Sequence, residues 1–309
     1  MNAVARAIAV VRLGRPIFLL GGFALYGLGA LAAVRRGYRF DGVAFALGQL
    51  AVSSIQLMTH YCNDYYDYEA DKANHTPTRW SGGSRVLVKH ELPRGVALRA
   101  ALLVGAIAPL AACALLVRSP AHAGAVVLLF VMQALAWSHA GPPLRFHSRG
   151  LGEPVTALVV PLFTPLAGFL LQSERFELFP VTLSAPLVLL QIAMLVTIEF
   201  PDYAGDRSVG KVSWVVLFGP ERAARLVQAS TVLAFLLAAA GTRLDVPPRV
   251  ALGFLALSPL AAVQCFRLQR GAHRRESAWE SLAFTSVALF FLAMVAELVG
   301  LASSATQPA

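Results

Sequence analysis

The chain has 309 residues, of which 57% are hydrophobic and 14% are charged, and its mean hydropathy is +0.64. Because a soluble domain carries about 25% charged residues, this composition excludes an ordinary soluble protein and predicts a membrane protein. The net charge of +9 could favour nucleic acid, but the Lys and Arg residues are dispersed over short segments between apolar runs. Membrane topology and anionic lipid explain that charge, so the expected partner is the lipid bilayer and not nucleic acid.

Nine apolar runs are long enough to cross a bilayer as helices. They lie near residues 16–34, 42–62, 96–117, 122–138, 153–172, 179–200, 223–240, 249–266 and 278–300. The fifth run contains Pro154, Pro161 and Pro165, which neighbouring helices can accommodate in a bundle. We therefore predict an all-α membrane protein, a nine-helix bundle that forms a single domain over residues 1–309.

Residues 1–15 precede the first run, and arginines interrupt their short apolar part. This pattern does not fit a cleaved signal peptide, and we expect an amphipathic helix on the membrane surface. If the N-terminus is cytoplasmic, 19 of the 26 Lys and Arg residues fall on the cytoplasmic side and 7 on the other. This positive-inside bias predicts a multi-pass protein of a bacterial cytoplasmic membrane with its N-terminus inside.

The three cysteines lie in or at the end of apolar runs and have no paired spacing. We interpret Cys62, Cys113 and Cys265 as core residues, because neither a disulfide framework nor a zinc site has this pattern.

The first acidic stretch, residues 63–71, directly follows the second run. It holds four of the 17 Asp and Glu residues of the chain, namely Asp64, Asp67, Glu69 and Asp71. If the second run continues as a helix, Asn63, Asp67 and Asp71 fall at positions i, i+4 and i+8 of one face, with Asp64 beside them. The predicted cytoplasmic loop 63–95 continues with Gly and Ser residues and with Arg79 and Arg85. Such a loop could bind phosphate, although a solvated loop would look similar.

A second loop, near residues 137–154, contains a Pro-Pro turn between His139 and Arg145. Arg145 could reach a diphosphate, or it could extend to the membrane surface as a turn arginine. His139 is a candidate substrate contact or a histidine that caps a helix end.

The second acidic stretch closes the sixth run and begins the predicted loop 201–222. Asp202 and Asp206 are spaced by one helical turn, and Lys211 follows. Several uncompensated carboxylates within a membrane bundle would cost on the order of 10 kcal/mol, so a cation is expected between the two stretches. Oxygen ligands of this kind suit Mg²⁺ completed by substrate phosphates, whereas the spacing of an EF-hand is absent. Because the two stretches close runs four helices apart, we also predict a parallel internal repeat of four helices, with a ninth appended.

At these residues the chain resembles the UbiA superfamily of intramembrane aromatic prenyltransferases. That family has the pattern N-D-x-x-D-x-x-x-D after its second helix, matched by residues 63–71, and D-x-x-x-D after its sixth, matched by residues 202–206. The segment Gly82–Leu87, the Pro-Pro-Leu-Arg turn, residues 149–153 and Gly210-Lys211 look most like the menaquinone branch, whose members prenylate 1,4-dihydroxy-2-naphthoate. Departures at His139 and at residues 199–201 lie near the expected acceptor side, so the acceptor stays open.

The resemblance implies a set of roles. Mg²⁺ would be held by Asn63, Asp67, Asp71, Asp202 and Asp206, with Asp64 as a further or supporting ligand. Lys211, Arg79, Arg85, Arg145 and Arg207 are candidates to stabilise the departing diphosphate, and Tyr203 could stabilise an allylic cation through its ring. The predicted reaction transfers a polyprenyl group from its diphosphate to a small aromatic acceptor in quinone biosynthesis.

Two other functions remain open at this point. A terpene cyclase of the same superfamily would use the same aspartates, and formation of product without an acceptor would identify it. A cation or substrate transporter would also place carboxylates along its path, but its site would be expected near the membrane midplane.

Overall fold

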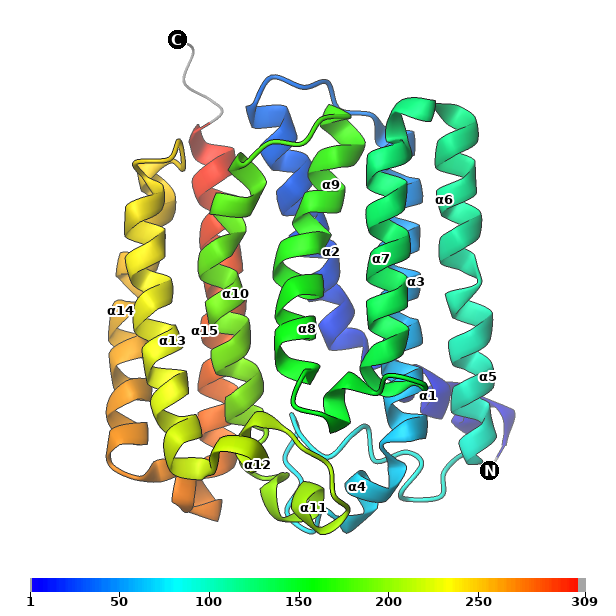
Figure 1. Cartoon of the computed structure of the whole chain (residues 1–309), viewed down its shortest axis with the longest axis vertical. Coiled ribbons are helices and arrows are strands. Elements are labelled where there is room, and N and C mark those ends of the chain that lie inside the picture. The colour runs from blue at the N-terminus through cyan, green and yellow to red at the C-terminus, as the bar shows by residue number, and fades with distance from the viewer. Residues whose placement is uncertain (1, 305–309) are drawn as a thin grey trace.

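The computed structural model describes residues 2–304, which fold into a helical bundle without a β-strand (Figure 1). Residue 1 and residues 305–309 of the predicted domain lie outside the described part. Within that part, nine helical spans are long and apolar enough to cross a membrane, as predicted. The spans are α2 (Pro16–Arg35), α3 (Gly42–Tyr66), α5 with α6 (Arg94–Gly105 and Ile107–Arg118), α7 (Ala123–Ala140), α8 with η3 and α9 (Gly152–Leu158, Val159–Phe163 and Thr164–Ser173), α10 (Phe179–Ile198), α13 (Pro220–Gly241), α14 (Pro248–Gln269) and α15 (Glu276–Ser304).

Short helices gather at one end of the bundle, at the bottom of Figure 1. They are α1 (Ala3–Leu13), α4 (Tyr68–Ala73), α11 (Tyr203–Ser208) and α12 (Trp214–Phe218). The side chain of Asn2 caps α1, which buries Ala9 and Leu13 and exposes Val4 and Ile8. An apolar outer face fits the surface helix expected at the N-terminus, and its position in a membrane stays a prediction.

The fifth span shows how a membrane helix accommodates proline. The chain passes from α8 through a π-helical turn, η3, which contains Pro161, and then into α9. The hydroxyl of Thr164 donates to the carbonyl of Val159 at 3.0 Å, so a side chain provides a hydrogen bond at the turn.

Close backbone contact joins α2 to α9. A Cβ atom at Gly29 would lie 1.8 Å from the carbonyl oxygen of Pro165, and one at Gly168 would lie 2.2 Å from that of Tyr26. Only glycine permits this crossing, as is typical of membrane helices that pack through small residues.

The apolar core is divided into clusters on the two sides of this crossing. One gathers α3, α5, α6 and α7, and another gathers α10, α13, α14 and α15. The division leaves space between α3 and α10, and the candidate site lies there. The predicted four-helix repeat is not tested by this division and remains a prediction.

Candidate active site

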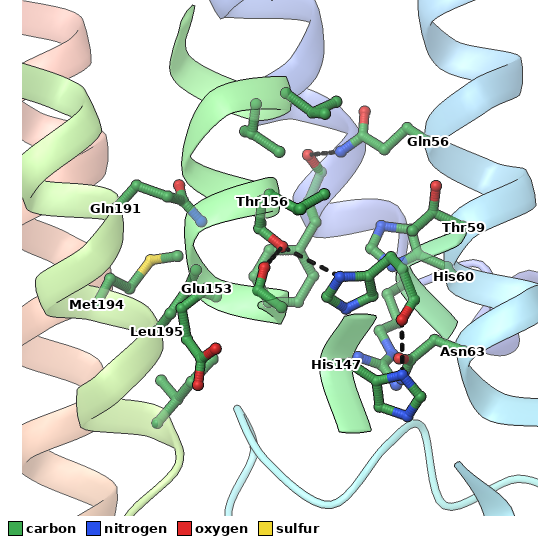
Figure 2. Close-up of a pocket in the computed structure, with 18 of the residues that line it drawn as sticks. Gln56, Thr59, His60, Asn63, His147, Glu153, Thr156, Gln191, Met194 and Leu195 are labelled. Atoms are coloured by element: carbon green, nitrogen blue, oxygen red, sulfur yellow. Dashed lines mark hydrogen bonds between the residues drawn. The ribbon is translucent and has the colours of Figure 1, made fainter. Parts of the chain in front are cut away.

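A cavity of about 310 Å³ lies between α3, α8 and α10 (Figure 2). Its apolar lining includes Leu25, Val52, Met132, Met194 and Phe290. Its polar lining includes residues of both acidic stretches, which lie at the ends of α3 and α10. A chamber of this kind can hold a hydrocarbon chain beside a charged group, because one region is apolar and another carries carboxylates.

Lys211 joins the two acidic stretches. Its ammonium Nζ lies 2.7 Å from Oδ2 of Asp67 and 3.3 Å from Oδ1 of Asp206. His147 approaches the other Asp67 oxygen, with Nε2 at 3.2 Å from Oδ1. Burial opposes ionisation of Asp67, but Lys211 and His147 outweigh it and hold the pKa of that carboxyl below its usual range. Burial likewise opposes the charge on Lys211, but Asp67, Asp206 and Asp202 raise its pKa, so the ammonium stays charged.

The first acidic stretch departs from the predicted continuous helix. The helix α3 ends at Tyr66, Asp67 stands between the helices, and α4 begins at Tyr68. The expectation of one unbroken helix is wrong at this residue, where His147 and Lys211 hold the Asp67 carboxylate from other segments. The i+4 spacing nevertheless persists, because the N–H groups of Asp67 and Asp71 donate to the carbonyls of Asn63 and Asp67 at 2.8 and 2.9 Å.

Asp64 is buried and faces a different partner. Nη2 of Arg15, at the start of α2, lies 2.5 Å from Oδ1 of Asp64, and the hydroxyl and backbone N–H of Ser84 also donate to this carboxylate. Asp64 therefore ties the loop after α4 to the N-terminal end of α2.

Asp71 is buried against the glycines of the same loop. A Cβ atom at Gly83 would lie 2.0 Å from Oδ2 of Asp71, and Gly83 has a φ of +72°, so this position requires glycine. Arg85 donates to the backbone carbonyl of Asp71, which fixes the loop over α4. Burial, and then the charges of Asp67 and Asp64, raise the pKa of Asp71 well above its usual value.

The second acidic stretch forms the predicted helical turn. The N–H of Asp206 donates to the carbonyl of Asp202 at 2.8 Å, and Nδ2 of Asn74 donates to Oδ1 of Asp202 at 2.5 Å. This amide contact joins α4 to α11. Burial, and then the charge of Asp206, raise the pKa of Asp202 to about 7. Oδ2 of Asp206 is buried and has no hydrogen-bond partner among the described residues.

The remaining predicted residues separate into two groups. Asn63 and His139 line the cavity together with Asp67, Asp202, Asp206 and Lys211. The other predicted residues are not among the residues that line it: Asp64, Asp71, Arg79, Arg85, Arg145, Tyr203 and Arg207. Of these, Arg79, Arg145 and Arg207 are exposed, and Arg207 donates to the hydroxyl of Tyr203 at 3.2 Å. Their roles at a diphosphate stay predictions.

Several cavity residues were not predicted from the sequence. Arg15 looked like one of many positive-inside charges, and His147 like part of a turn, yet both bind aspartates of the first stretch. Glu153, Gln191 and Glu199 line the opposite wall. Sequence signals existed for Glu153, which lies in the segment 149–153 that resembles the menaquinone branch, and for Glu199, which is the acidic residue that precedes Asp202 in the second stretch.

The donor set fits a hard divalent cation. Within residues 2–304, no group of three or more His, Cys, Asp or Glu side chains already forms a closed metal site. Mg²⁺ does not need one, because it keeps water and takes substrate oxygens alongside one or two carboxylates. The cavity offers carboxylates from both stretches, and the free oxygen of Asp206 is a ready ligand.

Comparisons with known proteins agree with this geometry. The model of the UbiA prenyltransferase family matches residues 20–301. The 1,4-dihydroxy-2-naphthoate octaprenyltransferase of Bacillus subtilis (strain 168) is 24% identical over 225 residues, which cover 73% of this chain and 70% of that protein.

Two solved structures share the fold. A digeranylgeranylglyceryl phosphate synthase superposes with a TM-score of 0.67 at 13% identity, covering 96% of this chain and 99% of its own. A UbiA homologue from Archaeoglobus fulgidus, bound to GPP and Mg²⁺, has a TM-score of 0.61 at 16% identity and covers 94% of this chain and 100% of its own. The chain is therefore a multi-pass membrane protein and a prenyltransferase, and it belongs to the UbiA prenyltransferase family.

Proposed function

We propose that the protein transfers a polyprenyl group from its diphosphate to 1,4-dihydroxy-2-naphthoate or a related aromatic acid, with Mg²⁺ as cofactor. The observation that carries the proposal is the convergence of both acidic stretches on Lys211 beside an apolar cavity. The naphthoate relative supports the acceptor class, and the homologue bound to GPP and Mg²⁺ supports the donor and the metal.

The proposed donor site uses the loops 63–95 and 201–222. Asn63, Asp67, Asp71, Asp202 and Asp206 are the proposed Mg²⁺ ligands. Bound Mg²⁺ would neutralise the diphosphate and make it a better leaving group. Lys211 adds a fixed positive charge next to Asp67 and Asp206, where negative charge develops as the carbon–oxygen bond breaks.

The apolar lining of the cavity keeps water away from the reacting group. Breaking the bond leaves an allylic cation, which water would destroy. Side chains such as Met132, Met194 and Phe290 exclude water from the cavity and leave the aromatic acceptor as the available nucleophile. A ring carbon of the acceptor then attacks the allylic carbon, and that ring carbon loses its carboxylate as CO₂, or its hydrogen as a proton where it carries no carboxylate.

We place the site at the cytoplasmic face of the membrane. The basis is the excess of Lys and Arg in the segments that share a side with α4 and α11.

The test is an assay of the full-length protein in lipid vesicles with Mg²⁺, labelled geranylgeranyl diphosphate and a panel of aromatic acids. We expect prenylated 1,4-dihydroxy-2-naphthoate from the wild type and none from Asp67→Ala or Asp202→Ala. A different prenylated acid would keep the reaction and change the acceptor. A cyclised hydrocarbon formed without acceptor would indicate a terpene cyclase, and no release of diphosphate would refute the proposal.

A further inference from the structure

Two carboxyl groups line the wall of the cavity and take part in none of the ion pairs of the acidic stretches. Glu153 belongs to α8, Glu199 follows α10, and both line the cavity. Glu153 is only 3% exposed, and the carboxyl oxygen Oε2 of Glu199 is also buried.

The orientation of the Glu153 carboxylate is fixed by the segment after Lys211. The backbone N–H of Trp214 donates to Oε1 of Glu153, and the indole N–H of Trp214 donates to the carbonyl of Gly150 at 2.9 Å. The Glu153 carboxylate is therefore held in place before any ligand arrives.

The pair has more acceptor capacity than the protein fills. Oε2 of Glu153 and Oε2 of Glu199 are both buried, and no N–H or O–H group of the described residues donates to either. Leaving buried acceptors without a donor is unfavourable, and a ligand that brings hydroxyl hydrogens would remove that cost. A ligand carboxylate would instead meet like charge.

Gln191 is an independent polar group on the same wall. It lies on α10 eight residues before Glu199, which corresponds to about 12 Å along a helix. It is 3% exposed and lines the cavity, and its Oε1 has no hydrogen-bond partner among the described residues. Figure 2 shows Gln191 together with Met194 and Leu195 on the side of the cavity that faces His60 and Asn63. The wall thus offers polar contacts separated by an apolar surface that suits an aromatic ring.

The cations of the cavity are already engaged. Among the described lining residues, Arg15 and Lys211 are the only Arg or Lys side chains, and both form ion pairs with aspartates. The wall of α8 and α10 therefore has no free positive charge with which to select a carboxylate.

We propose that this wall binds the aromatic acceptor by accepting its hydroxyl hydrogens at the Glu153–Glu199 pair, with Gln191 contacting a further polar substituent. The ligand class is a hydroquinone or phenol, recognised by its hydroxyl groups and not by its carboxylate. This inference rests on the proposed function, since it names how the acceptor of that reaction is held.

The test compares 1,4-dihydroxy-2-naphthoate with its dimethyl ether, which has no hydroxyl hydrogens. Binding is measured calorimetrically on the full-length protein in detergent, without prenyl diphosphate, for the wild type and Glu199→Leu. We expect the ether to bind the wild type ten- to a hundredfold more weakly, as loss of hydrogen bonds to a carboxyl group predicts, and this difference to fall below about threefold in the variant. Unchanged discrimination in Glu199→Leu would overturn the proposal.

Two further variants keep the result interpretable. Glu199→Gln preserves size and can donate to Glu153, so it should fold even if the leucine variant does not. A neutral amide accepts hydrogen bonds more weakly than a carboxylate. In this variant the preference for 1,4-dihydroxy-2-naphthoate over its dimethyl ether should therefore fall to between about three- and tenfold. Glu297→Gln removes another fully buried carboxyl, which is not among the lining residues, and its ratio of the two binding constants should equal that of the wild type.

Kinetics separate this inference from the proposed function. In vesicles, Glu199→Leu should raise the KM for the acceptor at least tenfold and leave the KM for the prenyl diphosphate within about twofold of the wild type. A rise in the KM for the diphosphate alone would assign the pair to the donor and refute the inference. Hydroxyl-dependent binding without any prenyl transfer would instead refute the proposed function and leave the binding site standing.

Discussion

The two ends of the bundle differ in how deeply their most buried ion pairs lie. At the end opposite α4 and α11, at the top of Figure 1, Arg36 pairs with Glu177 and Arg118 pairs with Asp41, each at 2.8 Å. These four side chains are 20–44% exposed, and Arg36 also lies 3.5 Å from the exposed carboxylate of Asp245. Exposed pairs of this kind connect loops and contribute at most about 1 kcal/mol each.

At the other end, the ammonium of Lys211 pairs with two buried carboxylates. Lys211 is 16% exposed, while its partners Asp67 and Asp206 are 9% and 4% exposed. Asp71 and Asp202 take part in none of the ion pairs found among the described residues, although burial raises the pKa of both. Buried carboxyl groups that lie outside these ion pairs and whose pKa is raised fit the proposed binding of Mg²⁺ at this end.

The largest expected effect compares one aspartate from each end. Asp202→Asn should lower prenyl transfer about a hundred- to a thousandfold, because it removes charge from the proposed metal site. Asp41→Asn is the matched control, since asparagine can still cap α3 and the lost pair with Arg118 is exposed. The measurement is kcat/KM in vesicles, and equal losses in the two variants would refute the contrast between the ends.

The second prediction concerns the shared cation. Lys211→Met should leave Asp67 and Asp206 without their ammonium and destabilise the protein by about 3 kcal/mol in the absence of metal. Mg²⁺ should raise the Tm of this variant more than that of the wild type, since it replaces the lost charge. Thermal unfolding in detergent with and without Mg²⁺ tests this, and an equal Mg²⁺ effect in both proteins would contradict it.

The third prediction compares two glycines with positive φ. Gly83→Ala places a Cβ atom against Asp71 at a φ of +72°, whereas Gly37→Ala at the opposite end has a φ of +90° and open space around it. Both should lose about 1 kcal/mol of stability from backbone strain. Gly83→Ala should also lower transfer about tenfold by displacing Asp71. Steady-state kinetics of both variants test this, and similar activities would show that the contact with Asp71 is unimportant.

The smallest effect is expected at an exposed pair. Arg36→Ala breaks the exposed contacts with Glu177 and Asp245 and should change stability by less than about 1 kcal/mol, with transfer unchanged. Thermal unfolding at low and high salt tests this. A loss comparable to that of Lys211→Met would mean that the two ends do not differ as described.

Local sequence features predicted much of the fold. Apolar runs of sufficient length located the spans, because a helix must satisfy its backbone hydrogen bonds internally wherever lipid replaces water. The i+4 spacing of Asp202 and Asp206 predicted their helical turn for the same local reason. The break in the helix at Asp67 was not predicted, because its carboxylate is held by partners distant in the sequence.

The sequence alone thus determined the helices, the positions of the acidic stretches and the family pattern, all of which depend on residues close together in the chain. Tertiary structure decided which charges meet. It brought Lys211 between the stretches, directed Arg145 and Arg207 outward, and assembled Glu153 with Glu199 on one wall. These outcomes depend on how helices that are distant in the sequence pack against one another. The packing decides how deeply a side chain is buried and which groups surround it, and these in turn decide its charge and its access to a ligand.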